Sequence, residues 1–195
     1  MGNDVPAGRR ERKKAATRTA ILEAATTLFL ERGFDAVTVR EIADKADVTP
    51  KTVYAHFPCK EALVFSTEGE QQDRLVAAVR DRTPGTTISD ALKTHYLAEI
   101  AILKSEPMNR ILALMEATPA LVEYAERMWL RHEEALIATL TDEFGLAEPS
   151  AEIRFYARFA LQIPLMARQA DPESAMDVGF RLLDRGWDHY DPTPR

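Results

Sequence analysis

Apolar residues recur at helical spacing along nearly the whole chain, and glycine or proline stands at most of the breaks. The first such run ends at Gly33, where a residue tolerant of positive φ suits a helix C-terminus, and its apolar positions are Ile21, Ala24, Ala25, Leu28 and Phe29. Further helices are predicted over residues 60–82, 88–104, 107–118, 118–144, 149–170 and 171–190. Because no segment alternates like a strand, the pattern predicts an all-α fold.

Two short helices separated by a sharp turn are predicted between the first helix and residue 60. Thr38 and Glu41 have the spacing of a capping box at the start of the first one. Thr49 is a suitable N-cap and Pro50 a suitable first residue for the second. Asp47 lies in the turn, and aspartate tolerates the left-handed conformation that such turns need. The arrangement predicts a helix-turn-helix element.

The second short helix has one apolar edge and one exposed face. Val53 and Phe57 are four residues apart and are expected to be buried. The residues left mostly outward are Lys51, Thr52, Tyr54 and Ala55. Small, basic and hydroxyl side chains on a short exposed helix suit the major groove of DNA. This face is therefore the predicted DNA-reading surface.

The sequence from residue 20 to residue 63, AILEAATTLFLERGFDAVTVREIADKADVTPKTVYAHFPCKEAL, resembles the DNA-binding head of TetR-type transcriptional regulators. The resemblance implies an all-helical homodimer in which a three-helix N-terminal head reads DNA and a larger helical body binds a ligand and dimerises. On this basis residues 1–60 are expected to form the DNA-binding domain and residues 61–195 the ligand-binding and dimerisation domain.

The resemblance also implies which residues meet DNA. Thr38, Tyr54, His56 and Lys60 align with positions that usually hold phosphates. The positions that face base edges or flanking sugars are Arg40, Thr49, Pro50, Lys51 and Thr52. For His56, a purely structural role beside its aromatic neighbour stays open.

Two residues of the head depart from the family pattern. Asp47 stands where the family usually has glycine, and Cys59 stands where serine, asparagine or glycine commonly caps the next helix. For Cys59 two interpretations remain open: a substitution of no special role, or a redox-sensitive thiol whose pKa is lowered by Lys60 and the helix N-terminus.

Charge is distributed unevenly between the two predicted domains. Residues 1–60 carry 11 Lys and Arg against 8 Asp and Glu, a net charge of +3, although the whole chain has a net charge of −6. A basic head on an acidic body is expected when only one end touches phosphates. The basic stretch Arg9–Lys14 is interpreted either as an arm that follows phosphates or enters a minor groove, or as a solvated tail.

Composition limits the remaining chemistry. One cysteine excludes an internal disulfide and a cysteine-rich zinc site. The basic start at residues 9–14 is not followed by the apolar region and small-residue cleavage site of a secretory signal, so it is not expected to be one. No run is long enough to span a bilayer, so the cytoplasm is the expected location and no membrane partner is expected. No cofactor or metal is predicted.

A ligand pocket is expected between the middle helices of the body. The candidate lining residues are His95, Tyr96, Leu103, Met108, Leu112, Met115, Trp129, Phe159 and Met166. Because most are apolar, an apolar or amphipathic effector is expected, although each residue taken singly is more typical of an ordinary core. The stretch 109–140 is loosely similar to regulators that bind acyl-CoA-like ligands, which would place phosphates near Arg110, Arg127 and Arg131.

The last two predicted helices are apolar over more than one face, which favours a dimerising four-helix bundle. The predicted interface residues are Phe159, Ile163, Met176, Gly179, Phe180, Leu183, Gly186 and Trp187. Burial inside one chain alone remains the alternative. Dimerisation would set two heads about 34–36 Å apart, as successive major grooves require.

The predicted function is a ligand-responsive regulator, a repressor in the favoured version, that binds palindromic operator DNA as a homodimer and is released by its effector. An enzyme is the main alternative, but the sequence has no HExxH, GxSxG, CxxC or Gly-rich phosphate loop. An architectural DNA binder without a ligand is disfavoured, because the large body is acidic.

Overall fold

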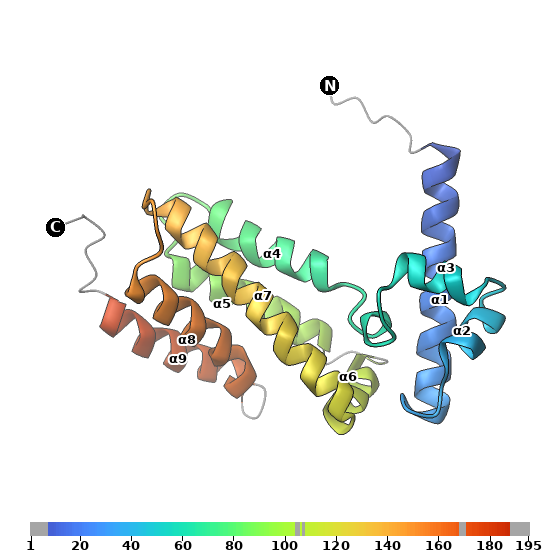
Figure 1. Cartoon of the computed structure of the whole chain (residues 1–195). Coiled ribbons are helices and arrows are strands. Elements are labelled where there is room, and N and C mark those ends of the chain that lie inside the picture. The colour runs from blue at the N-terminus through green and yellow to red at the C-terminus, as the bar shows by residue number, and fades with distance from the viewer. Residues whose placement is uncertain (1–7, 104–105, 107, 168–170, 188–195) are drawn as a thin grey trace. The chain divides into compact units, whose positions relative to one another are not determined.

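The computed structural model describes residues 8–103, 106, 108–167 and 171–187 (Figure 1). Across these ranges the chain forms nine α-helices, one 3₁₀ turn and no strand, so the predicted all-α fold is confirmed. The predicted helix ends near residues 170 and 190 lie outside the described residues. In the same ranges no helix combines the length and the apolar character that crossing a bilayer requires.

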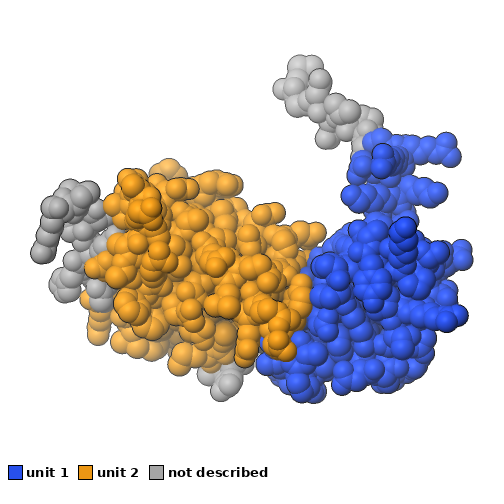
Figure 2. Space-filling view, viewed as in Figure 1, with its two compact units in different colours: residues 1–66, 110–122 blue, residues 67–109, 123–195 orange. Residues whose placement is uncertain are grey.

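The chain divides into two compact units, which Figure 2 shows in two colours. The first holds Met1–Ser66 and Arg110–Val122, and the second holds Thr67–Asn109 and Glu123–Arg195. The segment between residues 110 and 122 therefore groups with the head although it follows two helices of the body. A functional boundary between residues 60 and 61 stays a prediction.

The head is built on α1 (Arg9–Arg32), α2 (Val39–Lys45) and α3 (Pro50–His56). Its core is formed by apolar side chains that are at most 4% exposed, namely Ile21, Ala24, Ala25, Phe29, Phe34, Val37, Ile42, Ala43, Val53 and Phe57. The basic stretch from Arg9 to Lys14 forms the exposed first part of α1, which contradicts an unstructured tail. Its contact with phosphates stays a prediction. Arg, Lys, Glu and Ala are strong helix formers, and neither glycine nor proline interrupts the helix between Arg9 and Arg32.

The prediction of a single helix over residues 60–82 is wrong. A 3₁₀ turn, η1 (Glu61–Leu63), is followed by a further turn, and α4 (Glu68–Arg80) begins only then. The guanidinium of Arg18 donates to the carbonyl of Ser66 at 2.8 Å, so a long-range partner satisfies this oxygen instead of a helical amide. Burial of Leu63 and Phe65 in the head favours the same break.

The second unit is a helical body. It contains α4, α5 (Ile88–Leu103), most of α7 (Pro119–Glu143), α8 (Ala151–Ala167) and α9 (Pro172–Trp187), while α6 (Met108–Ala117) lies almost wholly in the first unit. One buried cluster joins α4, α5, α7, α8 and α9, with Leu75, Leu92, Leu136, Leu140, Ile153, Tyr156 and Met176 at 2% exposure or less. α8 continues through Pro164.

Close packing of α8 on α9 depends on Gly179. A Cβ atom at this position would lie 2.7 Å from Cγ2 of Ile163, which is closer than real Cβ contacts come. The helix that approaches this glycine is α8 of the same chain. We expect Gly179→Ala to lower the free energy of unfolding by about 1–3 kcal/mol through overpacking.

Urea unfolding checks this expectation through a double-mutant cycle with Ile163→Ala. The cost of Gly179→Ala should shrink in the Ile163→Ala background, because the clashing Cγ atoms are gone. Gly69→Ala in α4 is the matched control, since a Cβ atom at Gly69 would have nothing within 4 Å. Equal costs of Gly179→Ala in both backgrounds would contradict the packing argument.

Candidate nucleic-acid interface

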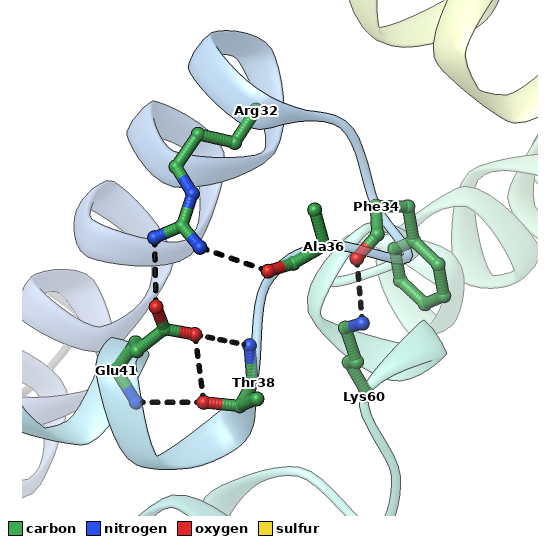
Figure 3. Close-up of polar contacts among 6 residues, drawn as sticks. All are labelled: Arg32, Phe34, Ala36, Thr38, Glu41 and Lys60. Carbon is green, nitrogen blue, oxygen red and sulfur yellow. Dashed lines mark hydrogen bonds and ion pairs between the residues drawn. The ribbon is translucent and has the colours of Figure 1, made fainter.

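The entrance to α2 is fixed by a capping box (Figure 3). The Thr38 hydroxyl accepts from the Glu41 amide at 3.2 Å, and the Glu41 carboxylate accepts from the Thr38 amide at 2.8 Å. Arg32, at the end of α1, donates to the same carboxylate at 2.7 Å and to the Ala36 carbonyl at 2.9 Å. The predicted capping box is confirmed, and Arg32 adds a bridge between α1 and α2 that the sequence pattern did not reveal.

These bonds make the head sensitive to acid. The Thr38 amide, followed by Arg32 and the Thr38 hydroxyl, lowers the pKa of Glu41 from 4.5 to about 2. Because the folded-state pKa is depressed, the stabilisation is present above pH 4.5 and is lost as the pH falls toward 2. We expect Glu41→Gln to reduce the loss of melting temperature between pH 6 and pH 3, measured by circular dichroism. Glu31→Gln, an exposed change on α1, is the control, and identical pH profiles for wild type and Glu41→Gln would contradict the expectation.

The turn into α3 has the predicted geometry. Asp47 has a φ of 53°, so this aspartate adopts the left-handed conformation at the position where the family pattern has glycine. Thr49 is the N-cap of α3, its hydroxyl accepts from the Thr52 amide at 3.2 Å, and Pro50 is the first helical residue. The helix-turn-helix is therefore held by local hydrogen bonds and by backbone conformations that its residues favour.

The face of α3 is divided as predicted between core and solvent. Val53 and Phe57 are buried, whereas Lys51 is exposed and the Tyr54 side chain is 54% exposed. The Thr52 hydroxyl lies 2.9 Å from the Thr49 hydroxyl, and Thr52 is half-buried. Lys51 and Tyr54 are therefore accessible to DNA, whereas the Thr52 hydroxyl is already bonded to the hydroxyl of the N-cap residue Thr49.

The other predicted DNA contacts on the head differ in accessibility. Thr38, Arg40, Thr49 and Pro50 are exposed, and His56 is half-buried. Lys60 is half-buried, and its Nζ donates to the Phe34 carbonyl at 2.6 Å and lies 4.1 Å from the Phe34 ring centre. Burial lowers the pKa of this ammonium. Lys60 therefore connects the segment after α3 to the α1–α2 connection, and a phosphate bound by Lys60 would share its ammonium group with the Phe34 carbonyl.

Arg18 is a second cation that acts inside the head, and the sequence reasoning did not single it out. Its guanidinium lies 4.3 Å from the Phe57 ring centre and donates to the carbonyls of Ser66 at 2.8 Å and His56 at 3.5 Å. Arg18 therefore holds the C-terminal end of α3 in place. The available signal was its register, because it stands three residues before the buried Ile21 on α1.

The structure does not favour a reactive thiol at Cys59. The side chain is half-buried, and burial is the main cause that raises the pKa of its thiol. A raised pKa lowers the thiolate fraction at neutral pH and hence the reactivity. The interpretation as a substitution without a special role is therefore the better supported of the two.

The predicted ligand residues are spread over both units. Tyr96 is buried, and His95, Leu103, Met108 and Trp129 are half-buried in the second unit. Leu112 and Met115 are half-buried on α6, in the first unit. Phe159 and Met166 are 53% and 74% exposed, so these two do not line an enclosed pocket in the described part of the chain.

The predicted dimer residues fall into three groups. Ile163, Met176 and Phe180 are buried in the core of this chain, Leu183 is half-buried against it, and Gly179 packs on Ile163. Phe159 faces outward. The side chains of Gly186 and Trp187 lie outside the described residues. The apolar stripe therefore contains both intramolecular core and free surface.

The free surface lies on α8 and α9. Its exposed apolar residues, here called the α8–α9 face, are Phe155, Phe159, Met166, Val178 and Leu182, with exposures between 43% and 74%. The rings of Phe155 and Phe159 are stacked with centres 6.0 Å apart. A cluster of large exposed apolar side chains on neighbouring helices marks an interaction surface.

The fold and the exposed α3 face define a helix-turn-helix DNA-binding protein. A sequence profile of the bacterial regulatory proteins of the tetR family matches residues 21–67. The transcriptional repressor Rv3405c of Mycobacterium tuberculosis is 32% identical over 145 residues, which cover 73% of this chain and 72% of the repressor. The chain belongs to the tetR family of transcriptional regulators, and it is a regulator rather than an enzyme.

Two further similar proteins are also transcriptional regulators. The transcriptional regulator TcmR of Streptomyces glaucescens is 28% identical over 129 residues, which cover 62% of this chain and 57% of that regulator. The chain thus spans little more than half of TcmR. The crystal structure of NalD, the secondary repressor of the MexAB-OprM multidrug efflux pump in Pseudomonas aeruginosa, aligns with a TM-score of 0.59 and 26% identity over 89% of this chain and 96% of NalD.

Proposed function

We propose that this regulator is a repressor that binds palindromic operator DNA as a homodimer and is released by a small apolar or amphipathic effector. The observation that carries the proposal is the pairing of an exposed reading face on α3 with the exposed apolar α8–α9 face. The first surface can meet base edges, and the second can join two copies so that two heads meet two half-sites. The cytoplasm, where operator DNA is found, is the proposed location.

On DNA, the proposed roles follow accessibility. Lys51, Thr52 and Arg40 meet base edges or flanking sugars, and Tyr54 and Thr38 hold phosphates. Thr49 and Pro50 start α3 and bring its N-terminal turn toward the groove. His56, at the C-terminal end of α3, supplies a further phosphate contact. Lys60 contributes mainly by fixing the end of α3, because its ammonium is already bonded to Phe34.

In the dimer, Phe159 and Phe155 of α8 pack with Val178 and Leu182 of α9 against the same face of a second copy, which gives a four-helix bundle. This proposal keeps Phe159 from the sequence prediction. It leaves out Met176 and Phe180, because their side chains are fully used in the core of one chain.

The effector acts by binding the operator-competent and operator-incompetent states with different affinity. An acyl-CoA-like effector stays a proposal that the arginines do not support. Arg131 is bonded to Glu68, Arg127 to Glu123, and Arg110 donates to the Leu30 carbonyl, so each guanidinium has a partner within the protein. A ligand with phosphates would have to displace these partners.

A gel-shift titration on DNA that flanks the gene of this chain tests the proposal, with long-chain acyl-CoA added in a parallel series. Specific retardation that acyl-CoA releases would support both the repressor and the acyl-CoA effector. Retardation that acyl-CoA does not affect would support the repressor and discard that effector. No specific retardation by any flanking fragment at low salt would contradict the proposed function.

A further inference from the structure

Among the described residues of the second unit, two polar atoms are buried without a hydrogen-bond partner. They are the hydroxyl oxygen of Tyr96 on α5 and Nε2 of His132 on α7, in side chains that are 5% and 4% exposed. A buried polar group without a partner costs about 1–3 kcal/mol, so proteins rarely keep one without a reason. The charge of Glu99 acts on both side chains, so they lie in the same part of the unit, and together they indicate a site that a ligand completes.

The protonation state of His132 follows from its single hydrogen bond. The ring bonds to the backbone of Glu68, and because Nε2 has no partner this bond uses the Nδ1–H group. Burial is the main cause that lowers the pKa of His132, so the ring is neutral near pH 7. Nε2 therefore carries a lone pair and can only accept a hydrogen bond.

Tyr96 offers the complementary group. Burial is the main cause that raises the pKa of its hydroxyl, which keeps its proton and can donate. The carboxylates nearby are already engaged, because Glu68 is bonded to Arg131 and Tyr124, and Glu99 is bonded to Arg74. No protein group among the described residues therefore competes for the Tyr96 hydroxyl or for Nε2 of His132.

The surroundings of the pair are aromatic. The Trp129 ring lies edge-on to His132 with centres 5.5 Å apart, and the His95 ring lies edge-on to Tyr96 at 4.9 Å. A lining rich in aromatic side chains suits an apolar ligand.

We propose that the Tyr96 hydroxyl and Nε2 of His132 are the polar anchors of the effector site, and that the effector is a neutral, mainly apolar compound with a hydroxyl group. The inference rests on the proposed function and specifies its effector. A ligand hydroxyl donates to Nε2, and a ligand oxygen accepts from Tyr96. Arg131 and Arg74 are already paired with Glu68 and Glu99, so neither of these cations is free to balance the charge of an anionic ligand.

Thermal unfolding in the absence of DNA tests this site with matched probes. The probes are 2-naphthol and 4-phenylphenol, each compared with its methyl ether and with 2-naphthoate. Both phenols should raise the melting temperature more than their ethers, and 2-naphthoate should have no effect. Tyr96→Phe should reduce the shifts given by the phenols and by their methyl ethers alike, because both offer an oxygen to the Tyr96 hydroxyl. It should not lower the melting temperature of the free protein, because the hydroxyl it deletes has no partner among the described residues.

A pair of His132 variants checks the second anchor. His132→Asn keeps a donor near the Glu68 backbone and removes the acceptor at the position of Nε2. The ratio of the affinities for a phenol and its methyl ether should therefore fall at least tenfold. His132→Gln places an amide near the position of Nε2 and should retain part of the preference. No shift with either phenol, equal shifts with phenols and ethers in the wild type, or undiminished shifts in Tyr96→Phe would overturn the inference.

These outcomes are separable from the repressor proposal, because gel shifts of the same variants report DNA binding independently. Tyr96→Phe and His132→Asn should retard operator DNA like the wild type. Retained DNA binding without any preference for phenols would reject only the effector site. Loss of all DNA binding by the wild type would reject the repressor.

Discussion

Replacing Phe159 with aspartate is expected to convert the proposed dimer into monomers and to weaken operator binding by about 10²–10⁴-fold, because two linked heads gain an effective concentration that single heads lack. The side chain is 53% exposed and stacks on Phe155, so its removal leaves the core of one chain intact. A charge on each copy would face its symmetry mate in an isologous interface. Sedimentation velocity and gel shifts measure the two effects.

Leu130→Asp is the matched control for this prediction. Leu130 is 50% exposed, nearly as much as Phe159, but it lies on α7 and not on the α8–α9 face. It should stay dimeric and bind the operator like the wild type. A dimeric Phe159→Asp protein with full operator affinity would show that the α8–α9 face is not the interface.

Lys51→Ala is expected to weaken specific operator binding by about 10–100-fold, which corresponds to a base-edge contact worth about 1–3 kcal/mol. Lys51 is exposed on α3, so the substitution should not change the melting temperature. Binding to unrelated DNA should fall much less. Fluorescence anisotropy with operator and scrambled duplexes separates the two effects.

Arg80→Ala removes one positive charge from the second unit and controls for the change in net charge. Arg80 is exposed and paired with Asp81, so its loss should leave both affinities nearly unchanged. If Lys51→Ala and Arg80→Ala weakened operator binding equally, the proposed role of α3 in reading bases would be wrong.

The head could be predicted in detail because its signals are local. The bond between Thr38 and Glu41, the cap at Thr49 and the left-handed conformation of Asp47 each depend on residues within four positions of one another. Local hydrogen bonds of this kind can be recognised from spacing alone. The break before α4 was missed because it depends on Arg18, which is 48 residues away from Ser66.

The body was harder to interpret, because a buried core and an interface between copies use the same apolar side chains. Phe159 on α8 and Phe180 on α9 both stand at helical spacing among apolar residues, yet Phe159 is 53% exposed and Phe180 only 3%. Only the packing of α8 on α9 decides which side of each helix the chain itself covers. The same holds for His132, whose unpartnered nitrogen cannot be recognised from its neighbours in sequence.

Composition does not distinguish cations that are bonded inside the head from cations that are accessible to DNA. Arg18 and Lys60 contribute to the positive charge of the head, but both are bonded to backbone carbonyls and packed on aromatic rings. Their charges still raise the local potential, and their main effect is to orient α3. Among the predicted DNA contacts, the cations that stay exposed are Lys51 on α3 and Arg40 on α2.

Selection of binding sites from a random DNA library with the purified full chain tests the central claim most directly. A dimer that reads DNA through two copies of α3 should enrich an inverted repeat whose half-site centres lie about 10 base pairs apart or a multiple of that spacing. Lys51→Ala should weaken or change the enriched half-site. Recovery of no motif, or of a motif without two-fold symmetry, would contradict the account.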